Sequence, residues 1–383
     1  MSGEVRRFEI RIPDRVLEDL HERLERTRFV RAIPGSGWEY GVNPGWLHEI
    51  TDYWRKDFDW RRQEAALNRI PQFITEIDGL DVHFLHQRSK EPGALPLLVT
   101  HGWPGSVAEF LKILDPLSDP VAHGGRAADA FHVVCPSLPG YGFSQAPRTP
   151  GCDVKRVAEI WIALMQRLGY ARYGAQGGDW GAMVNSYVAL LDSEHCCGLH
   201  LNLVLAARPG DEPAASLSPR EQADLEAARR YLREGAAYQA VQTLEPDTVG
   251  AALLDSPTGL AAWILDKFRR WTDCGGDPLR RFGRDELLTN VTLYWVTGTI
   301  ASSMRLYYES RRSGRFGPVQ ERVEVPTAAA IFPHELFRPP RRWAERLYRI
   351  ERWSEMPEGG HFAALEVPRL LVDDVRSFFR TRR

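Results

Sequence analysis

The segment Gly174-Ala175-Gln176-Gly177-Gly178-Asp179-Trp180-Gly181 places one carboxylate among glycines, where an expected strand turns into an expected helix. Small residues on both sides of such a turn let one strained residue project its side chain above a sheet, the arrangement called a nucleophile elbow. A serine usually stands at the centre of the Gly-x-x-x-Gly pattern, and here the central residue is Asp179. The spacing therefore predicts Asp179 as a nucleophile.

A carboxylate nucleophile suits a particular class of substrate. A serine that attacks a saturated carbon would leave an ether, which water does not cleave readily. A carboxylate leaves an alkyl ester, whose carbonyl carbon water can attack. Asp179 therefore indicates a substrate with an electrophilic sp³ carbon, such as an epoxide or an alkyl halide. Taken alone, an aspartate in a glycine-rich turn is equally well explained as a turn former or a helix N-cap.

The expected partners of Asp179 follow it in the chain. In folds with this elbow the order is nucleophile, acid, histidine. His361, in a glycine-rich loop after the last expected strand, is the candidate base, and Glu335, just after the preceding strand, is the candidate acid. Both are expected at the carboxyl ends of strands, where α/β sheets build their sites. The three residues in this order favour catalysis over a structural role.

Two backbone amides are expected to complete the site. His101-Gly102-Trp103-Pro104 follows a buried strand, and the N–H groups of Trp103 and Trp180 are predicted to form an oxyanion hole. Pro104 has no N–H and fixes the turn that aims the Trp103 amide. The pattern leaves open whether the Trp103–Pro104 bond is cis. His101 is equally explained by hydrogen bonds to the backbone.

Opening an epoxide produces an alkoxide, which needs a proton donor opposite the nucleophile, whereas a departing halide needs none. The region 206–316 offers tyrosines as donors: Tyr231, Tyr238, Tyr294, Tyr307 and Tyr308. A tyrosine on a helix usually serves packing. Composition and periodicity do not select among these five.

The chemistry-bearing residues need a scaffold that brings them together. Residues 73–77 and 80–86, joined by Asp78-Gly79, predict a β-hairpin. Apolar segments at 95–100 and 131–135, the strand before the elbow and a strand at 199–203 alternate with helical patterns, which is typical of a mostly parallel sheet. Residues 206–316 read as helical and predict a cap. Strands are expected again at 323–332 and 350–353, and residues 1–70 form a helical lead-in.

Composition narrows the function classes. The chain has 383 residues and a formal net charge of −2, which argues against nucleic acid as the main partner. Five scattered cysteines indicate reduced thiols in a cytoplasmic protein. No segment approaches the ~20 apolar residues of a membrane helix, and the N-terminal segment lacks the apolar core of a signal peptide. We therefore expect a soluble protein without a membrane partner.

Two further patterns are only weak evidence for a metal site or a dinucleotide-binding site. His195-Cys196-Cys197-x-x-His200 lacks the spacing of zinc ligands. Gly174-x-x-Gly177-Gly178 lies too late in the fold for a dinucleotide loop and lacks a downstream ribose-binding acid in a suitable βαβ unit. The prediction is a site without metal or cofactor.

Several motifs together resemble the epoxide hydrolases of the microsomal and juvenile-hormone type. The resemblance is carried by His101-Gly102-Trp103-Pro104, Gly177-Gly178-Asp179-Trp180-Gly181 and the run from Gly359 to Pro368. It extends into the lead-in through Asp59-Trp60-Arg61, Leu67-Asn68, Pro71-Gln72-Phe73 and Ile77-Asp78-Gly79-Leu80. The membrane anchor of the animal microsomal members is not found, which resembles the soluble bacterial relatives.

The resemblance implies an α/β-hydrolase fold, with an eight-stranded, mostly parallel sheet, a helical cap and the lead-in. The implied division is 1–70 for the lead-in, 71–205 and 317–383 for the core, and 206–316 for the cap. It implies Asp179 as nucleophile, His361 as base and Glu335 as its acid partner. It also assigns Tyr238 and Tyr307 as the acid tyrosines, with Tyr308 left open as an alternative to Tyr307.

The predicted function is cofactor-free conversion of a small hydrophobic epoxide and water into a vicinal diol, through a covalent ester on Asp179. A haloalkane dehalogenase shares the fold and the aspartate nucleophile and is the nearest alternative. A non-catalytic scaffold that binds a hydrophobic molecule is the alternative from another class, and the intact order of Asp179, Glu335 and His361 argues against it. A homodimer is left open, as is a role in detoxification, hydrocarbon catabolism or natural-product biosynthesis.

Overall fold

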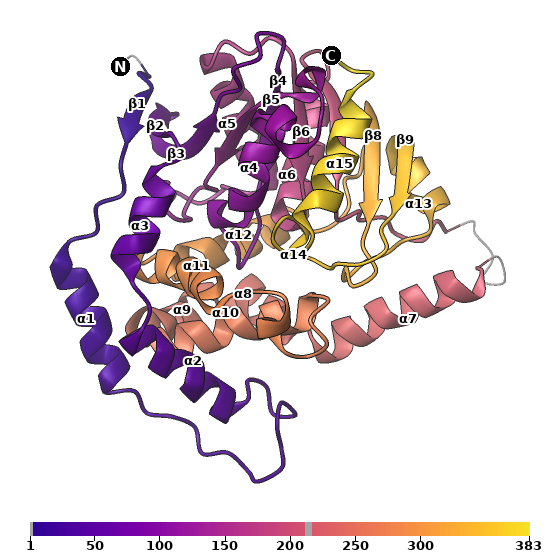
Figure 1. Ribbon diagram of the computed structural model, residues 1–383. Helices are drawn as coiled ribbons and strands as arrows, with labels where there is room; N and C mark the ends of the chain where they lie inside the picture. Colours follow the sequence, from indigo (N-terminus) through magenta and orange to yellow (C-terminus); the bar gives the residue numbers. More distant parts are fainter. Residues whose placement is uncertain (1–2, 211–216) are drawn as a thin grey trace.

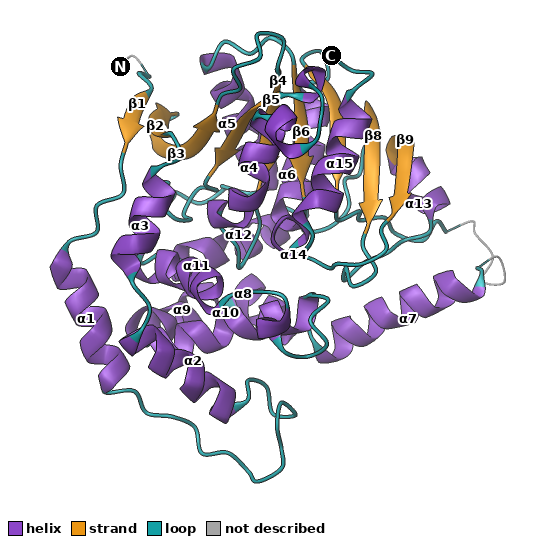
Figure 2. Ribbon diagram, in the orientation of Figure 1, coloured by secondary structure: helices purple, strands orange, loops and turns teal. Residues whose placement is uncertain are grey.

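The computed structural model describes residues 3–210 and 217–383 (Figure 1). A central twisted sheet carries helices on both faces, and a second layer of helices lies across the carboxyl ends of the strands (Figure 2). Residues 1–2 of the expected lead-in and 211–216 of the expected cap lie outside the described residues. The site is expected at the junction of the sheet and the second layer.

The described residues form a nine-stranded sheet in the order β1-β2-β3-β5-β4-β6-β7-β8-β9. Six neighbouring strands run parallel to one another: β5, β4, β6, β7, β8 and β9. The other three pair antiparallel with their neighbours, β3 with β5, β2 with β3 and β1 with β2. The strands are β1 Arg6–Phe8, β2 Gln72–Ile77, β3 Leu80–Gln87, β4 Leu95–Thr100, β5 Phe131–Pro136, β6 Tyr173–Gly177, β7 Cys196–Leu201, β8 Val323–Ile331 and β9 Tyr348–Glu355. This is the α/β-hydrolase fold.

The sheet has one strand more than the expected eight. Strand β1 pairs antiparallel with β2, with Arg6 opposite Ile74. Its three residues are too few to show a period-2 pattern, and they fall in a lead-in whose other elements are helical. The strand forms because β2 offers an unpaired edge, which a sequence pattern does not reveal.

The central strands are covered on both faces. Leu97, Leu98 and Val99 of β4 are all fully buried, as expected for a parallel strand between two layers of helices. One face packs on α4 (Leu111–Ser118) and α15 (Pro368–Phe379), and the other on α5 (Val154–Arg167) and α6 (Asp179–Leu191). Smaller helices complete the core: η1 Val107–Phe110, η2 Pro120–His123, η3 Ala127–Asp129, α13 Arg341–Leu347 and α14 Ala363–Glu366.

The cap is entirely helical in its described part. Its helices are α7 Pro219–Glu234, α8 Ala237–Leu244, α9 Pro246–Asp255, α10 Pro257–Trp271, η5 Pro278–Arg280, α11 Arg284–Thr297 and α12 Ile300–Arg312. The helical pattern of the sequence runs without a break over residues 286–308 and predicts one helix there, but the structure has two, α11 and α12. Gly298 adopts a left-handed conformation (φ 62°) at the C-cap of α11 and ends that helix before α12 begins.

The lead-in helices pack on the cap. Helices α1 (Asp14–Glu25) and α2 (Pro44–Lys56) lie against α10, while α3 (Trp60–Asn68) contacts α11 (Figure 1). The Tyr53 hydroxyl donates to Asp285 at 2.8 Å and joins α2 to the start of α11. Among the described residues, no single helix is long and apolar enough to cross a membrane; α9 and α10, bent by 120°, satisfy the length and composition only together.

Candidate active site

Asp179 stands at the elbow between β6 and α6. Strand β6 ends at Gly177, α6 begins at Asp179, and Asp179 itself has a positive φ of 48°. Such a conformation is costly for a residue with a side chain and is typical of functional turns. At Gly181, a Cβ atom would lie 2.0 Å from the Thr100 carbonyl oxygen, so only glycine allows α6 to approach β4 this closely.

The turn after β4 contacts the Asp179 carboxylate. The Trp103 N–H donates to Asp179 Oδ1 at 2.8 Å, and the Trp103–Pro104 bond is cis. At Gly102, a Cβ would stand 2.2 Å from Asp179 Oδ1, so the backbone must lack a side chain there. The Trp180 N–H belongs to the first turn of α6, where amides have no acceptor within the helix. The Trp103 amide therefore contacts the carboxylate directly, and the Trp180 amide directly follows Asp179 in the chain.

His101 holds this turn through backbone contacts. Its Nε2 accepts from the Leu138 N–H at 3.1 Å, so the proton of the neutral ring is on Nδ1, which donates to the Gly102 oxygen at 3.0 Å. Burial lowers the pKa of His101 to about 4. His101 is thus a neutral support of the turn that carries Trp103.

The structure brings His361 and Glu335 to Asp179. His361 Nε2 lies 3.2 Å from Asp179 Oδ2, and His361 Nδ1 lies 2.7 Å from Glu335 Oε1. Glu335 Oε1 also accepts from the Leu336 N–H at 2.6 Å, which fixes the carboxylate. His361 is only 5% exposed. The three side chains are therefore in direct contact although they come from three separate loops.

Burial disfavours a charged ring at His361, but the neighbouring carboxylates of Glu335 and Asp179 outweigh it and raise the pKa of His361 well above its ordinary value. With Asp179 ionised, the ring is a cation placed between two anions. Neutralising either anion removes one cause of the raised pKa.

Cap residues fix the loop that carries His361. The Trp271 carbonyl, at the end of α10, accepts from the His361 N–H at 2.9 Å, and the Trp271 ring meets the imidazole edge-on at 5.0 Å. Asp273 accepts from the Gly359 N–H at 3.1 Å. The cap thus positions the candidate base, and the sequence pattern gave no signal for this.

Two cap tyrosines line the same cavity as Asp179. The Tyr238 ring stacks on Trp103 with centroids 5.2 Å apart, and the Tyr307 ring meets Trp180 edge-on at 4.5 Å. Both tyrosines line the cavity that Asp179 and His361 border. Burial first, and the Asp179 charge in addition, raise the pKa of both tyrosines, so their hydroxyls remain protonated donors.

The remaining tyrosines have other contacts. The Tyr294 hydroxyl donates to the Gly105 oxygen at 2.7 Å, behind the turn. Tyr308 accepts from Arg312 at 3.2 Å on the neighbouring face of α12. The Tyr231 hydroxyl lies 3.2 Å from that of Tyr238. The contacts of the five tyrosines therefore distinguish among proton-donor candidates that the sequence pattern did not distinguish, and they favour Tyr307 over Tyr308.

Gln239 is a site residue that the sequence analysis missed. Its Nε2 donates to the Tyr238 hydroxyl at 3.0 Å, and its side chain lines the same cavity. This bond occupies an acceptor position on Tyr238 and leaves the Tyr238 proton free to be directed elsewhere. In the sequence, the only feature that could have indicated Gln239 as a site residue is that it directly follows Tyr238.

The cavity above Asp179 has a volume of about 400 Å³. Its polar lining residues include Asp179, His361 and the two tyrosines. The rest of the wall is mainly apolar: Met183, Leu203, Val204, Leu205, Leu225, Leu232, Phe316, Leu336 and Phe337. A small apolar molecule with one polar reacting centre fits such a cavity.

The histidines of the His195–His200 segment have protein partners. His195 Nδ1 lies 2.6 Å from Asp192, and His200 Nε2 lies 3.0 Å from Asp374. Within residues 3–210 and 217–383, no group of three or more His, Cys, Asp or Glu side chains is arranged to hold a metal ion.

Comparison with known proteins identifies the family. Residues 5–110 match the family model of the epoxide hydrolase N terminus, and residues 96–246 match that of the alpha/beta hydrolase fold. Epoxide hydrolase 1 of Oryctolagus cuniculus is 41% identical over 401 residues, covering 98% of this chain and 88% of that protein. The chain belongs to the epoxide hydrolases. A protein of Stigmatella aurantiaca, provisionally named as an epoxide hydrolase, is 48% identical over 98% of this chain and 85% of its own length.

Solved structures agree with this assignment. The crystal structure of juvenile hormone epoxide hydrolase from the silkworm Bombyx mori superposes with a TM-score of 0.91 at 34% identity, covering 100% of this chain and 95% of that one. The similarity thus includes the lead-in and the cap as well as the sheet. The expected microsomal and juvenile-hormone type of epoxide hydrolase is confirmed.

Proposed function

We propose that this epoxide hydrolase opens its substrate through a covalent ester on Asp179. The observation that carries the proposal is the contact of Asp179 with both the Trp103 amide and His361, at 2.8 and 3.2 Å, beneath the two cap tyrosines. A carboxylate held this way can act as a nucleophile and can later expose its own ester carbonyl to attack.

In the first step Asp179 attacks an epoxide carbon while Tyr238 and Tyr307 donate hydrogen bonds to the ring oxygen. The C–O bond of the ring breaks, an ester bond forms, and a tyrosine supplies the proton that the alkoxide needs. Ester formation removes the Asp179 charge, which is one of the causes of the raised pKa of both tyrosines. Their acidity therefore increases as the alkoxide develops.

In the second step His361 takes a proton from water, and the resulting hydroxide attacks the ester carbonyl of Asp179. The Trp103 and Trp180 amides stabilise the oxyanion, and its collapse releases a vicinal diol. Ester formation removes the Asp179 charge that helped to raise the pKa of His361, so the imidazolium can return its proton through water to the tyrosinate left by the first step and then act as a base. When the tetrahedral intermediate collapses, the diol oxygen takes up the proton of the Asp179 carboxyl group. Glu335 keeps Nδ1 protonated, so Nε2 is the atom that accepts.

The substrate class follows from the cavity. Its volume of about 400 Å³ and mainly apolar wall favour a small hydrophobic epoxide over a charged one. The reaction consumes water and needs no cofactor.

A single turnover in water labelled with oxygen-18, with enzyme in excess, tests the ester. Water attacks Asp179 and not the substrate carbon, so the first diol should contain only unlabelled oxygen and the label should appear in the elbow peptide. Labelled diol in the first turnover would exclude the covalent route. Haloalkanes serve as the control substrates, and halide release faster than epoxide opening would favour a dehalogenase.

A further inference from the structure

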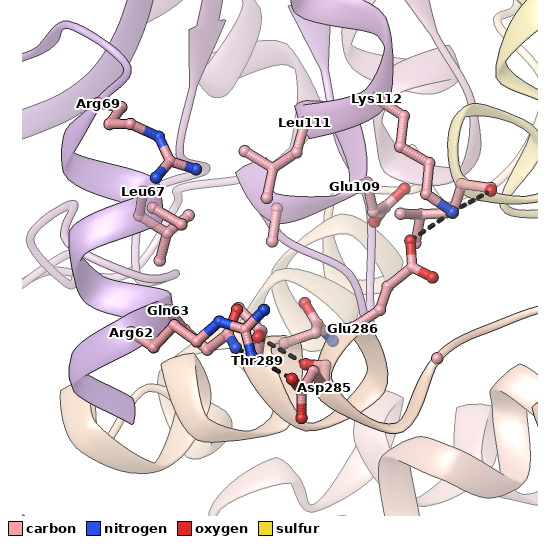
Figure 3. Close-up of a pocket in the computed structure, with 15 residues that line it drawn as sticks. Arg62, Gln63, Leu67, Arg69, Glu109, Leu111, Lys112, Asp285, Glu286 and Thr289 are labelled. Atoms are coloured by element: carbon pink, nitrogen blue, oxygen red, sulfur yellow. Dashed lines mark hydrogen bonds and ion pairs between the residues drawn. The ribbon is translucent and has the colours of Figure 1, made fainter. Parts of the chain in front are cut away.

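A second cavity lies on another side of the catalytic residues, between the lead-in, the start of α4 and the cap helix α11. Its volume is about 580 Å³. Figure 3 shows its wall, with Gln63 and Leu67 from α3, Lys112 from α4 and Asp285 from α11. No described residue lines both this cavity and the epoxide cavity, so the two cavities are separate spaces.

The wall of this second cavity is rich in charged groups. Lys112 Nζ lies 2.6 Å from Glu286 and donates to the Leu365 oxygen at 2.9 Å, which joins α4 to the cap and to α14 (Figure 3). Gln63 donates to Asp285 at 3.4 Å on the opposite side. These polar groups offer hydrogen-bond partners to water molecules in the cavity.

A third and much smaller cavity lies directly behind the catalytic pair. It is bordered by Asp179, His361, Trp103 and Glu109 and has a volume of about 20 Å³. A single water needs roughly 10–15 Å³ of such space and two to four polar partners. The carboxylate of Asp179 and the imidazole of His361 are both available there, so the cavity suits one water next to the atoms that take part in ester hydrolysis.

Glu109 borders both the small and the large cavity. It lies in η1, and Figure 3 shows its carboxyl group in the wall between Leu111 and Lys112. At Gly105 a Cβ would stand 1.2 Å from Glu109 Oε1, so the absence of a side chain at Gly105 makes room for this carboxyl group. Glu109 is the one polar side chain, among the described residues, that lines both cavities.

We propose that the water that hydrolyses the ester reaches Asp179 from the 580 Å³ cavity, past Glu109, while the epoxide uses the other cavity. The inference rests on the proposed covalent mechanism. Once the alkyl group is attached to Asp179 it fills the apolar cavity, and water needs a second approach to the ester. Glu109 hydrogen-bonds the arriving water and orients it toward His361.

The electrostatics of Glu109 agree with this role. Burial raises its pKa to about 8; the His361 charge opposes this, and the Asp179 charge adds to it. A carboxyl group that is mostly protonated near neutral pH both donates and accepts hydrogen bonds to water.

The test separates the two chemical steps in rapid-mixing single turnovers. Tryptophan fluorescence follows ester formation, since Trp103 and Trp180 flank Asp179, and quenched-flow diol analysis follows hydrolysis. In Glu109→Gln and Glu109→Leu, the ester should form within about twofold of the wild-type rate but hydrolyse about 10- to 100-fold more slowly, the larger loss in Glu109→Leu. The ester should therefore accumulate on the elbow peptide, with kcat and KM falling together.

Two further variants sharpen the result. Gly105→Ala displaces the Glu109 carboxyl group and should reproduce the slow hydrolysis with Glu109 still present. Asp115→Asn removes an exposed carboxylate from α4 outside both cavities and should leave both rates unchanged. Hydrolysis at the wild-type rate in Glu109→Leu, or an equal slowing of both steps, overturns the proposal. Absence of any ester in the wild type overturns the covalent mechanism instead.

Discussion

At the scale of single residues, the charge of Asp179 contributes to the pKa of several groups around it. Its charge is among the causes that raise the pKa of His361, Tyr238, Tyr307 and Glu109. In the proposed mechanism, forming a neutral ester removes this contribution from the pKa values of all four groups at once. The tyrosines become better acids when the alkoxide needs a proton, and His361 becomes able to accept a proton from water. One charge therefore links the two halves of the reaction.

The contribution of the tyrosines can be measured individually. Tyr307→Phe and Tyr238→Phe each remove one donor to the epoxide oxygen, and we expect ester formation to slow by about 10²-fold, as for loss of one oxyanion donor. Ester hydrolysis should change far less. Tyr308→Phe is the matched control, since Tyr308 contacts Arg312 and not the cavity. An equal effect of Tyr308→Phe and Tyr307→Phe on ester formation would contradict the assignment.

At the scale of elements, helix α7 forms part of the epoxide cavity but has no residue in the buried core. It lies apart from the other cap helices in Figure 1. Part of its attachment is polar, because Arg338 binds Asp224 of α7 at 2.6 Å and also donates to the Glu335 backbone oxygen at 2.6 Å. The loop that carries the acid of the catalytic set therefore also holds one wall of the substrate cavity.

Loosening α7 should affect binding more than chemistry. Asp224→Asn breaks a half-buried ion pair worth about 1 kcal/mol, which corresponds to roughly a fivefold increase in KM with kcat within about twofold. Glu226→Gln is the control, because Glu226 pairs with Arg233 on the solvent side of the same helix at 3.1 Å. Steady-state kinetics on one epoxide compare the three enzymes. A fall in kcat without a change in KM would argue against this role of α7.

At the scale of the whole molecule, a buried polar cluster joins the last helix to the sheet. Asp374 of α15 contacts His200 of β7 at 3.0 Å and Arg352 and Ser354 of β9 at 2.7 Å each. Burial opposes ionisation, but these bonds outweigh it and lower the pKa of Asp374 well below its ordinary value. The ionised carboxylate therefore stabilises the fold.

The sign of this linkage predicts a pH dependence. Because the pKa of Asp374 is lower in the folded than in the unfolded protein, the ionised carboxylate stabilises the fold at pH values above the unfolded-state pKa of about 3.9. This contribution is lost as the pH falls below about 3.9. Asp374→Asn should lower the free energy of unfolding by about 3 kcal/mol at pH 7. Urea titrations at pH 7 and 5 should show the same difference from wild type, and the difference should shrink below about pH 4. A constant difference down to pH 3 would contradict the assignment.

Much of the site was predictable because its signals are local. The glycines around Asp179 and the turn at His101–Pro104 encode their own backbone geometry, since the close approaches at Gly102 and Gly181 exclude side chains. The order of Asp179, Glu335 and His361 then follows from strands whose carboxyl ends meet at one edge. The sequence by itself thus determined the core of the fold and the class of chemistry, and it predicted as reacting residues three side chains that the structure brings into contact.

Other features depended on contacts between distant segments. Strand β1 forms by pairing with the edge of β2, and the left-handed conformation of Gly298 separates α11 from α12. Packing on Trp103 and Trp180 distinguishes Tyr238 and Tyr307 from the other three tyrosines. Glu109 became distinctive only when α3, α4 and α11 enclosed a cavity beside it. Only the tertiary structure decided these, because burial, cavity walls and shifted pKa values arise from packing between segments and leave no periodic signal in any one of them.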